Sequence, residues 1–168
     1  MSDTVFATLL GTPVGGLALL VRDDVLVAAG FTDVDDQFGR LRTNATLRRV
    51  DDLGMVTTAM RDYFDGDVTA FDTLPVEQPG GSFHQAAWKA MRAIPAGETI
   101  SYAELAARAG NPDAVRAAGS ACAQNMVAPI VPCHRIVRTG GALGGYYYGL
   151  DTKRWLLAHE QGADSLPL

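Results

Sequence analysis

Cys133 and His134 are the residues whose types and spacing could do covalent chemistry. They lie in the stretch IVPCHRIV, residues 130–137, where apolar residues flank a proline, a cysteine, a histidine and an arginine. Buried structural cysteines rarely have such polar neighbours, a disulfide needs a partner, and metal ligands come in groups. A thiolate is a good nucleophile, and a nearby histidine can take its proton. The stretch predicts a nucleophilic Cys133, with a packed and unreactive thiol as the alternative.

The cysteine and histidine counts limit the other chemistries. The chain has two cysteines, Cys122 and Cys133, and three histidines, His84, His134 and His159. A disulfide scaffold needs more cysteines, and a zinc site needs clustered ligands. We therefore predict no metal.

The composition predicts a globular, cytoplasmic protein. The chain has 168 residues, of which 48% are hydrophobic and 20% charged. Its longest apolar stretch, residues 5–21, is broken by glycine and proline, and Asp3 stands where a signal peptide would carry a basic residue. We expect no membrane association.

The charge is unevenly distributed along the chain. A net charge of −5 argues against a nucleic-acid partner. However, residues 1–83 carry six arginines against thirteen acidic residues, or −7, whereas residues 84–160 carry eight basic against five acidic residues, or +3. An anionic partner would therefore meet the C-terminal half.

Two kinds of local pattern divide the chain. Short Val- and Leu-rich runs at 5–10, 17–21 and 25–30, separated by turn residues, predict strands, and residues 50–64 have helical spacing. Residues 69–81 contain two prolines and two glycines and are typical of a linker. The pattern after the linker is helical.

Capping signals predict where three of these later helices begin. Ser82 with Gln85, and Ser101 with Glu104, form possible capping boxes, and Asn111-Pro112 is a typical start for a helix that runs to about residue 124. The last two helices, joined around Gly110, predict a helix-turn-helix, with an ordinary helical hairpin as the alternative.

The last of these helices carries small residues next to one arginine. Arg116 is followed by Ala117, Ala118 and Gly119. A recognition helix in a major groove usually carries long polar side chains. Small residues allow close approach to a minor groove, but they equally suit tight helix packing, so both hypotheses stay open.

The order of motifs resembles a known family. Ser101-Tyr102, Arg116-Ala117, Asn125, Pro132-Cys133-His134-Arg135, Gly144-Gly145-Tyr146 and Leu156-Leu157 before Glu160 follow one another. This set strongly resembles the O6-alkylguanine-DNA alkyltransferases, also called methylated-DNA–protein-cysteine methyltransferases. The resemblance runs at least from Phe83 to Glu160 and extends more weakly to the N-terminal part.

The resemblance implies the role of each catalytic residue. Cys133 would be the thiolate that takes the alkyl group, with His134 as its base through a water molecule and Glu160 orienting the imidazole. Tyr102 would donate to the departing guanine, and Asn125 would hold the turn that carries the cysteine. No cofactor is implied.

The resemblance also implies how DNA and the base are held. Arg116 would fill the space of a flipped base, while Ala117, Ala118 and Gly119 lie in the minor groove. Arg135 and Arg138 would contact phosphate, with solvated charge as the alternative. The guanine and alkyl pocket would be formed by backbone groups of Cys133 and Ile136 and by the loop with Tyr146, Tyr147 and Tyr148.

The fold implied is α+β. A small N-terminal β-sheet lobe, ribonuclease-H-like, would span residues 1–78, a helical DNA-binding lobe with the helix-turn-helix residues 79–162, and a tail residues 163–168. The protein would act as a monomer on double-stranded DNA containing O6-alkylguanine, and also on O4-methylthymine. A non-catalytic lesion-binding or regulatory helix-turn-helix module, and a cysteine hydrolase with a Cys-His-Glu triad, are the competing hypotheses.

Two departures from the common family pattern concern the site. Tyr146-Tyr147-Tyr148 places bulky residues where many members have Gly or Ser, and Met126 follows Asn125 where proline is frequent. We expect Tyr148 to narrow the alkyl pocket and the turn after Asn125 to be looser.

Overall fold

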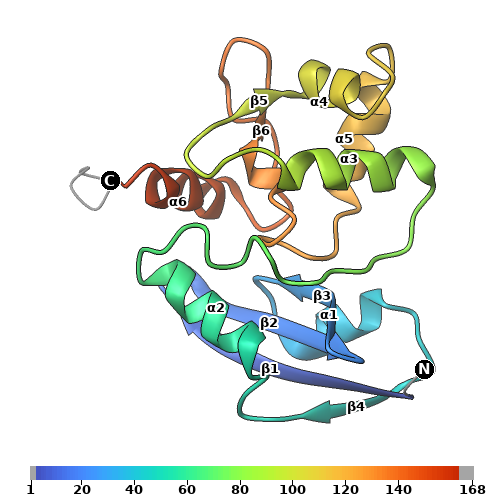
Figure 1. The fold of residues 1–168 in the computed structure, drawn as a ribbon, viewed down its shortest axis with the longest axis vertical. Coiled ribbons are helices and arrows are strands. Elements are labelled where there is room, and N and C mark those ends of the chain that lie inside the picture. Colours follow the sequence, from blue (N-terminus) through green and yellow to red (C-terminus); the bar gives the residue numbers. More distant parts are fainter. Residues whose placement is uncertain (1–2, 163–168) are drawn as a thin grey trace. The chain divides into compact units, whose positions relative to one another are not determined.

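The computed structural model describes residues 3–162, which form two compact units (Figure 1). The first unit runs to Gln78 and also contains Met126–Ile130. The second unit contains Pro79–Asn125 and residues 131–162.

A four-stranded sheet is the centre of the first unit. Strands β1 (Thr4–Thr12), β2 (Gly15–Arg22) and β3 (Val25–Gly30) are antiparallel neighbours, and β4 (Thr46–Arg49) pairs parallel with β1, giving the order β3-β2-β1-β4. The three predicted strands are confirmed. Tight turns at 13–14 and 23–24 join them, as the Gly/Pro and Asp-Asp signals indicate.

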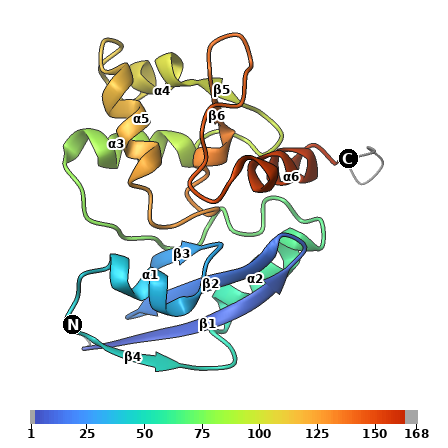
Figure 2. The ribbon, with the colours of Figure 1, turned by 180° about the vertical axis from the view of Figure 1, so that it is seen from behind.

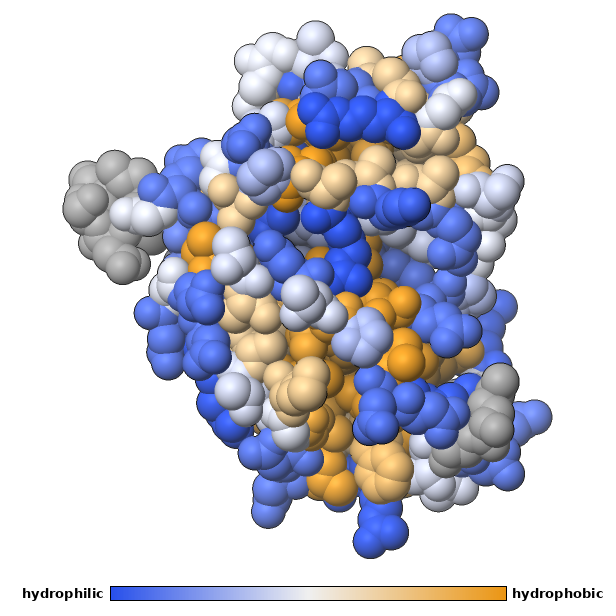
Figure 3. Space-filling model, in the orientation of Figure 1, coloured by the Kyte–Doolittle hydropathy of each residue, from blue (hydrophilic) through white to orange (hydrophobic). Residues whose placement is uncertain are grey.

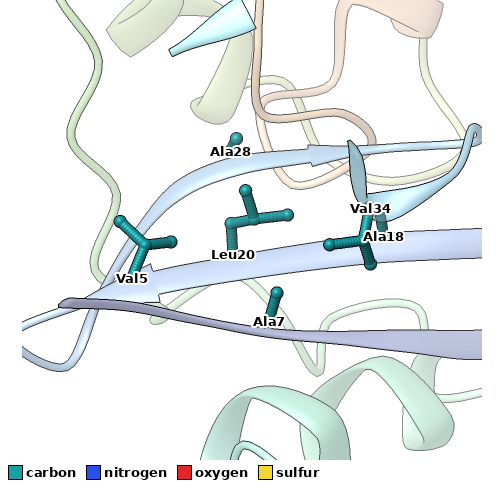
Figure 4. Close-up of a cluster of buried hydrophobic side chains, with 6 residues drawn as sticks. All are labelled: Val5, Ala7, Ala18, Leu20, Ala28 and Val34. Atoms are coloured by element: carbon teal, nitrogen blue, oxygen red, sulfur yellow. The ribbon is translucent and has the colours of Figure 1, made fainter. Parts of the chain in front are cut away.

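Two helices cover opposite faces of this sheet. Helix α1 (Val34–Arg40) lies on one face and α2 (Met55–Phe64) on the other (Figures 1 and 2). Asp33 caps α1, because its carboxylate accepts from the backbone N–H of Asp36 at 2.8 Å. Figure 4 shows an apolar cluster formed by Val34 of α1 and by residues of the sheet, which are Val5, Ala7, Ala18, Leu20 and Ala28.

The segment 126–130 joins the first unit by backbone pairing, although it lies within the range that the sequence assigns to the second lobe. The carbonyl of Met126 accepts from Ala29 N–H at 2.8 Å, and Ala128 N–H donates to the carbonyl of Ala29 at 3.0 Å. The side-chain oxygen of Gln78 accepts from Met126 N–H at 2.8 Å. These hydrogen bonds fix the turn that follows Asn125, where Met126 stands in place of the proline that is frequent in the family.

The second unit is mainly helical (Figure 2). It contains α3 (Ser82–Arg92), α4 (Tyr102–Arg108), α5 (Val115–Ala123) and α6 (Leu150–Glu160). The short strands β5 (Ile100–Ser101) and β6 (Ile136–Val137) pair in parallel, and a single 3₁₀ turn, η1 (Cys133–Arg135), precedes β6. The indole N–H of Trp88 donates to the carbonyl of Ala121 at 2.9 Å and joins α3 to α5.

One of the three predicted helix starts is confirmed. The hydroxyl of Ser101 accepts from Glu104 N–H at 3.0 Å and caps α4. The capping box at Ser82 is wrong, because Gly81 is the N-cap of α3 and Ser82 lies inside the helix.

The start at Asn111-Pro112 is also wrong. The side-chain oxygen of Asn111 accepts from Asp113 N–H at 3.1 Å and forms a local turn, so that α5 begins only at Val115.

Within residues 3–162 none of the helices combines the length and the apolar content that a membrane crossing requires. Figure 3 shows hydrophobic residues gathered over part of the first unit. Among the described residues of that unit, the exposed large apolar side chains are Phe6, Leu9 and Met55.

Candidate active site

The backbone around Cys133 is fixed by a buried amide. Asn125 is only 3% exposed, and its side-chain N–H donates to the carbonyl of Val131 at 2.7 Å. The same carbonyl accepts from the N–H of Cys133 at 2.9 Å. Pro132 then leads into η1, so Asn125 holds the turn on which Cys133 stands.

His134, Arg135 and Glu160 form a buried network. His134 Nε2 lies 2.8 Å from Glu160 Oε2, while Arg135 donates from Nε to Oε1 at 2.8 Å and from Nη2 to Oε2 at 3.0 Å. The three side chains are at most 2% exposed. One carboxylate on α6 therefore orients both residues that follow Cys133.

The charge of Glu160 determines which histidine nitrogen carries the proton. Burial raises the pKa of the Glu160 carboxyl, but the adjacent His134 and Arg135 outweigh burial and hold that pKa well below its ordinary value. An ionised carboxylate only accepts hydrogen bonds, so His134 must present Nε2–H to it. Nδ1 of the neutral ring is then an acceptor and can serve as a base.

Arg135 does not lie where a phosphate contact would require. It is 1% exposed, and its remaining Nη1 donates to the carbonyl of Ile94 at 2.7 Å. The expected contact of Arg135 with phosphate is therefore wrong for this structure, because the carboxylate of Glu160 and the end of α3 hold the guanidinium inside the unit.

A cavity of about 210 Å³ lies beside Cys133. Residues of α4, α5, η1 and the loop before α6 line it: Tyr102, Gly119, Cys122, Ala123, Cys133, Gly145, Tyr146 and Tyr147. A pocket with the nucleophile in its wall can hold a small planar ligand.

Tyr102 lies at this cavity as a protonated phenol. Burial raises its pKa, and the nearby thiol groups of Cys122 and Cys133 raise it further, so the hydroxyl keeps its proton and can donate. Gly144 passes close to this ring: a Cβ at position 144, where φ is +70°, would lie 2.9 Å from the hydroxyl oxygen. Glycine is required there on both counts.

The three adjacent tyrosines have different positions. Tyr146 and Tyr147 line the cavity, whereas Tyr148 is not among its lining residues and packs edge-on against both, with ring centroids 5.7 and 4.9 Å away. The expectation that Tyr148 itself narrows the pocket is therefore not met; it supports the two rings that do. Ile136 does not line the cavity either: it is fully buried in β6, and its carbonyl accepts from Lys153.

The small residues of α5 divide by helical period. Ala118 is fully buried, so its small side chain serves helix packing. It cannot contact a DNA groove. Arg116 is exposed, Ala117 is half-buried, and Gly119 lines the cavity. The minor-groove hypothesis thus applies to Arg116, Ala117 and Gly119 only.

Lys153 was not expected from the sequence. It is fully buried in α6, and its ammonium donates to the carbonyls of Ile136 at 2.7 Å, Gly145 at 3.2 Å and Leu143. Burial lowers the pKa of Lys153, while the two thiols oppose that shift. The one available signal was its spacing from Leu156 and Glu160, which places all three on the buried stripe of α6.

Cys122 shares the cavity but differs from Cys133 in its surroundings. Burial, and to a lesser extent Cys133, raise the pKa of the Cys122 thiol far above its ordinary value, and Lys153 opposes this only weakly. A thiol that stays protonated is a poor nucleophile. Among residues 3–162, no group of three or more side chains is arranged to hold a metal ion.

Comparison with known proteins identifies the family. The protein-family model described as 6-O-methylguanine DNA methyltransferase, DNA binding domain, matches residues 82–162. A methylated-DNA–protein-cysteine methyltransferase of Haemophilus influenzae is 36% identical over 160 residues, covering 94% of this chain and 87% of that protein. The chain belongs to the methylated-DNA–protein-cysteine methyltransferase family. The methyltransferase of Mycolicibacterium paratuberculosis is 40% identical over 150 residues, covering 89% and 88%.

The match to other methyltransferases of the family is shorter. That of Salmonella typhimurium is 42% identical over 107 residues, which are 64% of this chain and 63% of that protein, so the chain spans less than two thirds of that relative.

Solved structures of the same family agree with the fold over nearly the whole chain. The O6-methylguanine methyltransferase of Mycobacterium tuberculosis superposes with a TM-score of 0.80 at 32% identity, over 97% of this chain and 96% of that one. A structure of Mycobacterium tuberculosis OGT in complex with DNA gives a TM-score of 0.82 at 32% identity, over 94% of both chains. The predicted sheet lobe followed by a helical part is confirmed.

Proposed function

We propose that this protein repairs DNA by direct reversal. It takes the alkyl group, methyl in the simplest case, from O6-alkylguanine, and also from O4-methylthymine, onto its own Cys133. The observation that carries the proposal is Cys133 in the wall of a cavity, followed in sequence by a histidine that a buried carboxylate orients. The names of its relatives support the same activity.

The proposed reaction is a displacement at the alkyl carbon. The proton of the Cys133 thiol moves through a water molecule to Nδ1 of His134, and the thiolate forms a bond to the carbon. The bond between that carbon and guanine O6 breaks, and its electron pair stays on the base. The hydroxyl of Tyr102 donates to the base as negative charge builds up. A thioether results that water does not reverse, so each protein acts once.

A base in a duplex must first leave the stack. We propose that α4 and α5 act as a helix-turn-helix that approaches the minor groove, and that the exposed Arg116 fills the space of the flipped base. The protein would act as a monomer in the cytoplasm on double-stranded DNA. The intact Cys133 disfavours a purely lesion-binding module.

Transfer of a labelled methyl group tests this function. The wild-type protein, incubated with duplex DNA carrying O6-methylguanine with an isotopically labelled methyl group, should become labelled. Cys133→Ala should bind the same duplex and take up no label. Release of labelled methanol, as a cysteine hydrolase would give, or repeated turnover by one protein, contradicts the proposal.

A further inference from the structure

Two buried polar atoms near Cys133 have no hydrogen-bond partner. Among residues 3–162, three buried side-chain atoms lack one, and the two in the second unit are Nδ1 of His134 and the hydroxyl of Tyr146. Their rings are neighbours, with centroids 6.4 Å apart and planes at 82°. A buried hydroxyl without a partner is costly, so such groups in native proteins usually mark a bound water or a functional contact.

The Tyr146 hydroxyl can only be a proton-bearing group. Burial raises its pKa well above the ordinary value, and the neighbouring Cys133, Tyr148 and Glu160 raise it further. It therefore donates a hydrogen bond at any pH at which the protein works. Its ring would line the cavity equally well as phenylalanine, so the hydroxyl needs an explanation of its own.

We propose that Tyr146 is a positioning residue for the proton transfer between Cys133 and His134. Its hydroxyl donates to the water molecule that joins the two. That water accepts from Tyr146 and from the Cys133 thiol, and it donates to Nδ1 of His134. When the thiol proton passes to the water, the water passes one of its own protons to Nδ1, which leaves a thiolate, a water and an imidazolium.

The inference rests on the proposed function, but the ionisation of Cys133 can be measured without DNA. The other ionisable groups at this site are His134, Glu160, Arg135, Tyr102, Cys122, Lys153 and Tyr148. None of them is altered by Tyr146→Phe. Only the hydroxyl that donates to the bridging water is lost. The variant should therefore destabilise the thiolate–imidazolium pair of Cys133 and His134 relative to the neutral thiol and imidazole.

The test measures how fast iodoacetamide alkylates Cys133 as a function of pH, in a Cys122→Ser background. We expect Tyr146→Phe to shift the midpoint upward, so that the rate below the wild-type midpoint falls about three- to tenfold while the plateau at high pH is retained. Tyr147→Phe is the matched control: it removes the hydroxyl of a neighbouring tyrosine that is 64% exposed, and it should leave this midpoint in place.

Superimposable pH profiles for Tyr146→Phe and its parent overturn the inference. A decrease of the alkylation rate by the same factor at every pH overturns it as well. If Tyr146→Phe fails to fold, a high-resolution structure of the wild-type protein decides: no water in contact with both the Tyr146 hydroxyl and His134 Nδ1 refutes it. Failure of the proposed function would appear differently, as absence of methyl transfer with an intact midpoint shift.

Discussion

Glu160 binds two buried side chains that carry N–H donors, Arg135 and His134. The carboxylate accepts three hydrogen bonds, two from Arg135 and one from His134. Removing one member of such a network leaves a buried charge without compensation, which typically costs about 3–5 kcal/mol. The network therefore serves both stability and the orientation of the base.

Glu160→Gln should lower the free energy of unfolding near pH 7 by about 3–5 kcal/mol, measured by urea denaturation. Glu104→Gln is the matched control, because its bond to Arg108 is half exposed and such pairs contribute about 1 kcal/mol or less. Comparable losses in the two variants would contradict the role of Glu160.

The same residue predicts a pH dependence. Its folded pKa lies below the ordinary 4.5, so its contribution is fully present above that value and is lost as the pH falls through the folded pKa. The stability difference between the wild type and Glu160→Gln should therefore shrink progressively below pH 4.5. A difference that stays constant down to strongly acidic pH would show that Glu160 is not the titrating group.

At the level of the elements, the sequence predicted what depends on local pattern. Val- and Leu-rich runs separated by turn residues located β1 to β3, and the capping box located α4. Helix α1 and β4 were not predicted, because seven and four residues rich in charge carry too little apolar periodicity.

Features that depend on distant partners were beyond local pattern. Arg135 was expected to contact phosphate, and its burial could not be predicted because its partners, Glu160 and Ile94, lie 25 and 41 residues away. The three tyrosines at 146–148 are chemically alike, so the sequence could not tell which two face the cavity. The stretch around Cys133 itself predicted a nucleophile, whereas the expected roles of His134 and Glu160 in one triad came from the family resemblance.

Lys153 connects α6 to β6 and to the loop that forms one wall of the cavity. Lys153→Met removes the donor to three carbonyls, and we expect a loss of about 1–3 kcal/mol in unfolding free energy together with slower methyl transfer. Lys89→Met, the other lysine of the chain, is exposed on α3 and should change neither. Amide hydrogen exchange at residues 143–145 should accelerate only in Lys153→Met. Unchanged exchange there would show that the hydrogen bonds of Lys153 do not hold the loop.

Helix α5 carries the prediction on base flipping. Arg116→Ala should slow transfer from duplex DNA by about ten- to a hundredfold, because unstacking a paired base costs a few kcal/mol. Reaction with free O6-methylguanine base needs no flipping and should change little. Arg154→Ala, an exposed arginine of α6, is the control. Equal losses on duplex and free base would remove Arg116 from this role.

At the scale of the whole molecule, charge limits how DNA is bound. The chain carries −5 overall, and the basic surplus of residues 84–160 is only +3. Because Arg135 is buried, it is not available to phosphate, which reduces the basic surface further. Few phosphates can therefore be neutralised, and we expect weak discrimination between alkylated and undamaged DNA.

The affinity for duplex DNA should therefore vary little with salt. Each neutralised phosphate contributes roughly −0.9 to the slope of log affinity against log salt, and we expect a slope of only a few such contributions. Fluorescence anisotropy with an alkylated and an unmodified duplex measures it. A steep slope, typical of a protein with many phosphate contacts, would refute this account of the charge distribution.

The central claim is that Cys133 accepts one alkyl group and is then spent. Mass spectrometry of the protein after incubation with excess O6-methylguanine duplex, followed by peptide mapping, tests it most directly. We predict a mass increase of one methylene unit per chain, located on Cys133, with the protonated Cys122 unmodified. A methyl group on Cys122, more than one per chain, or an unmodified protein beside demethylated DNA would contradict the account.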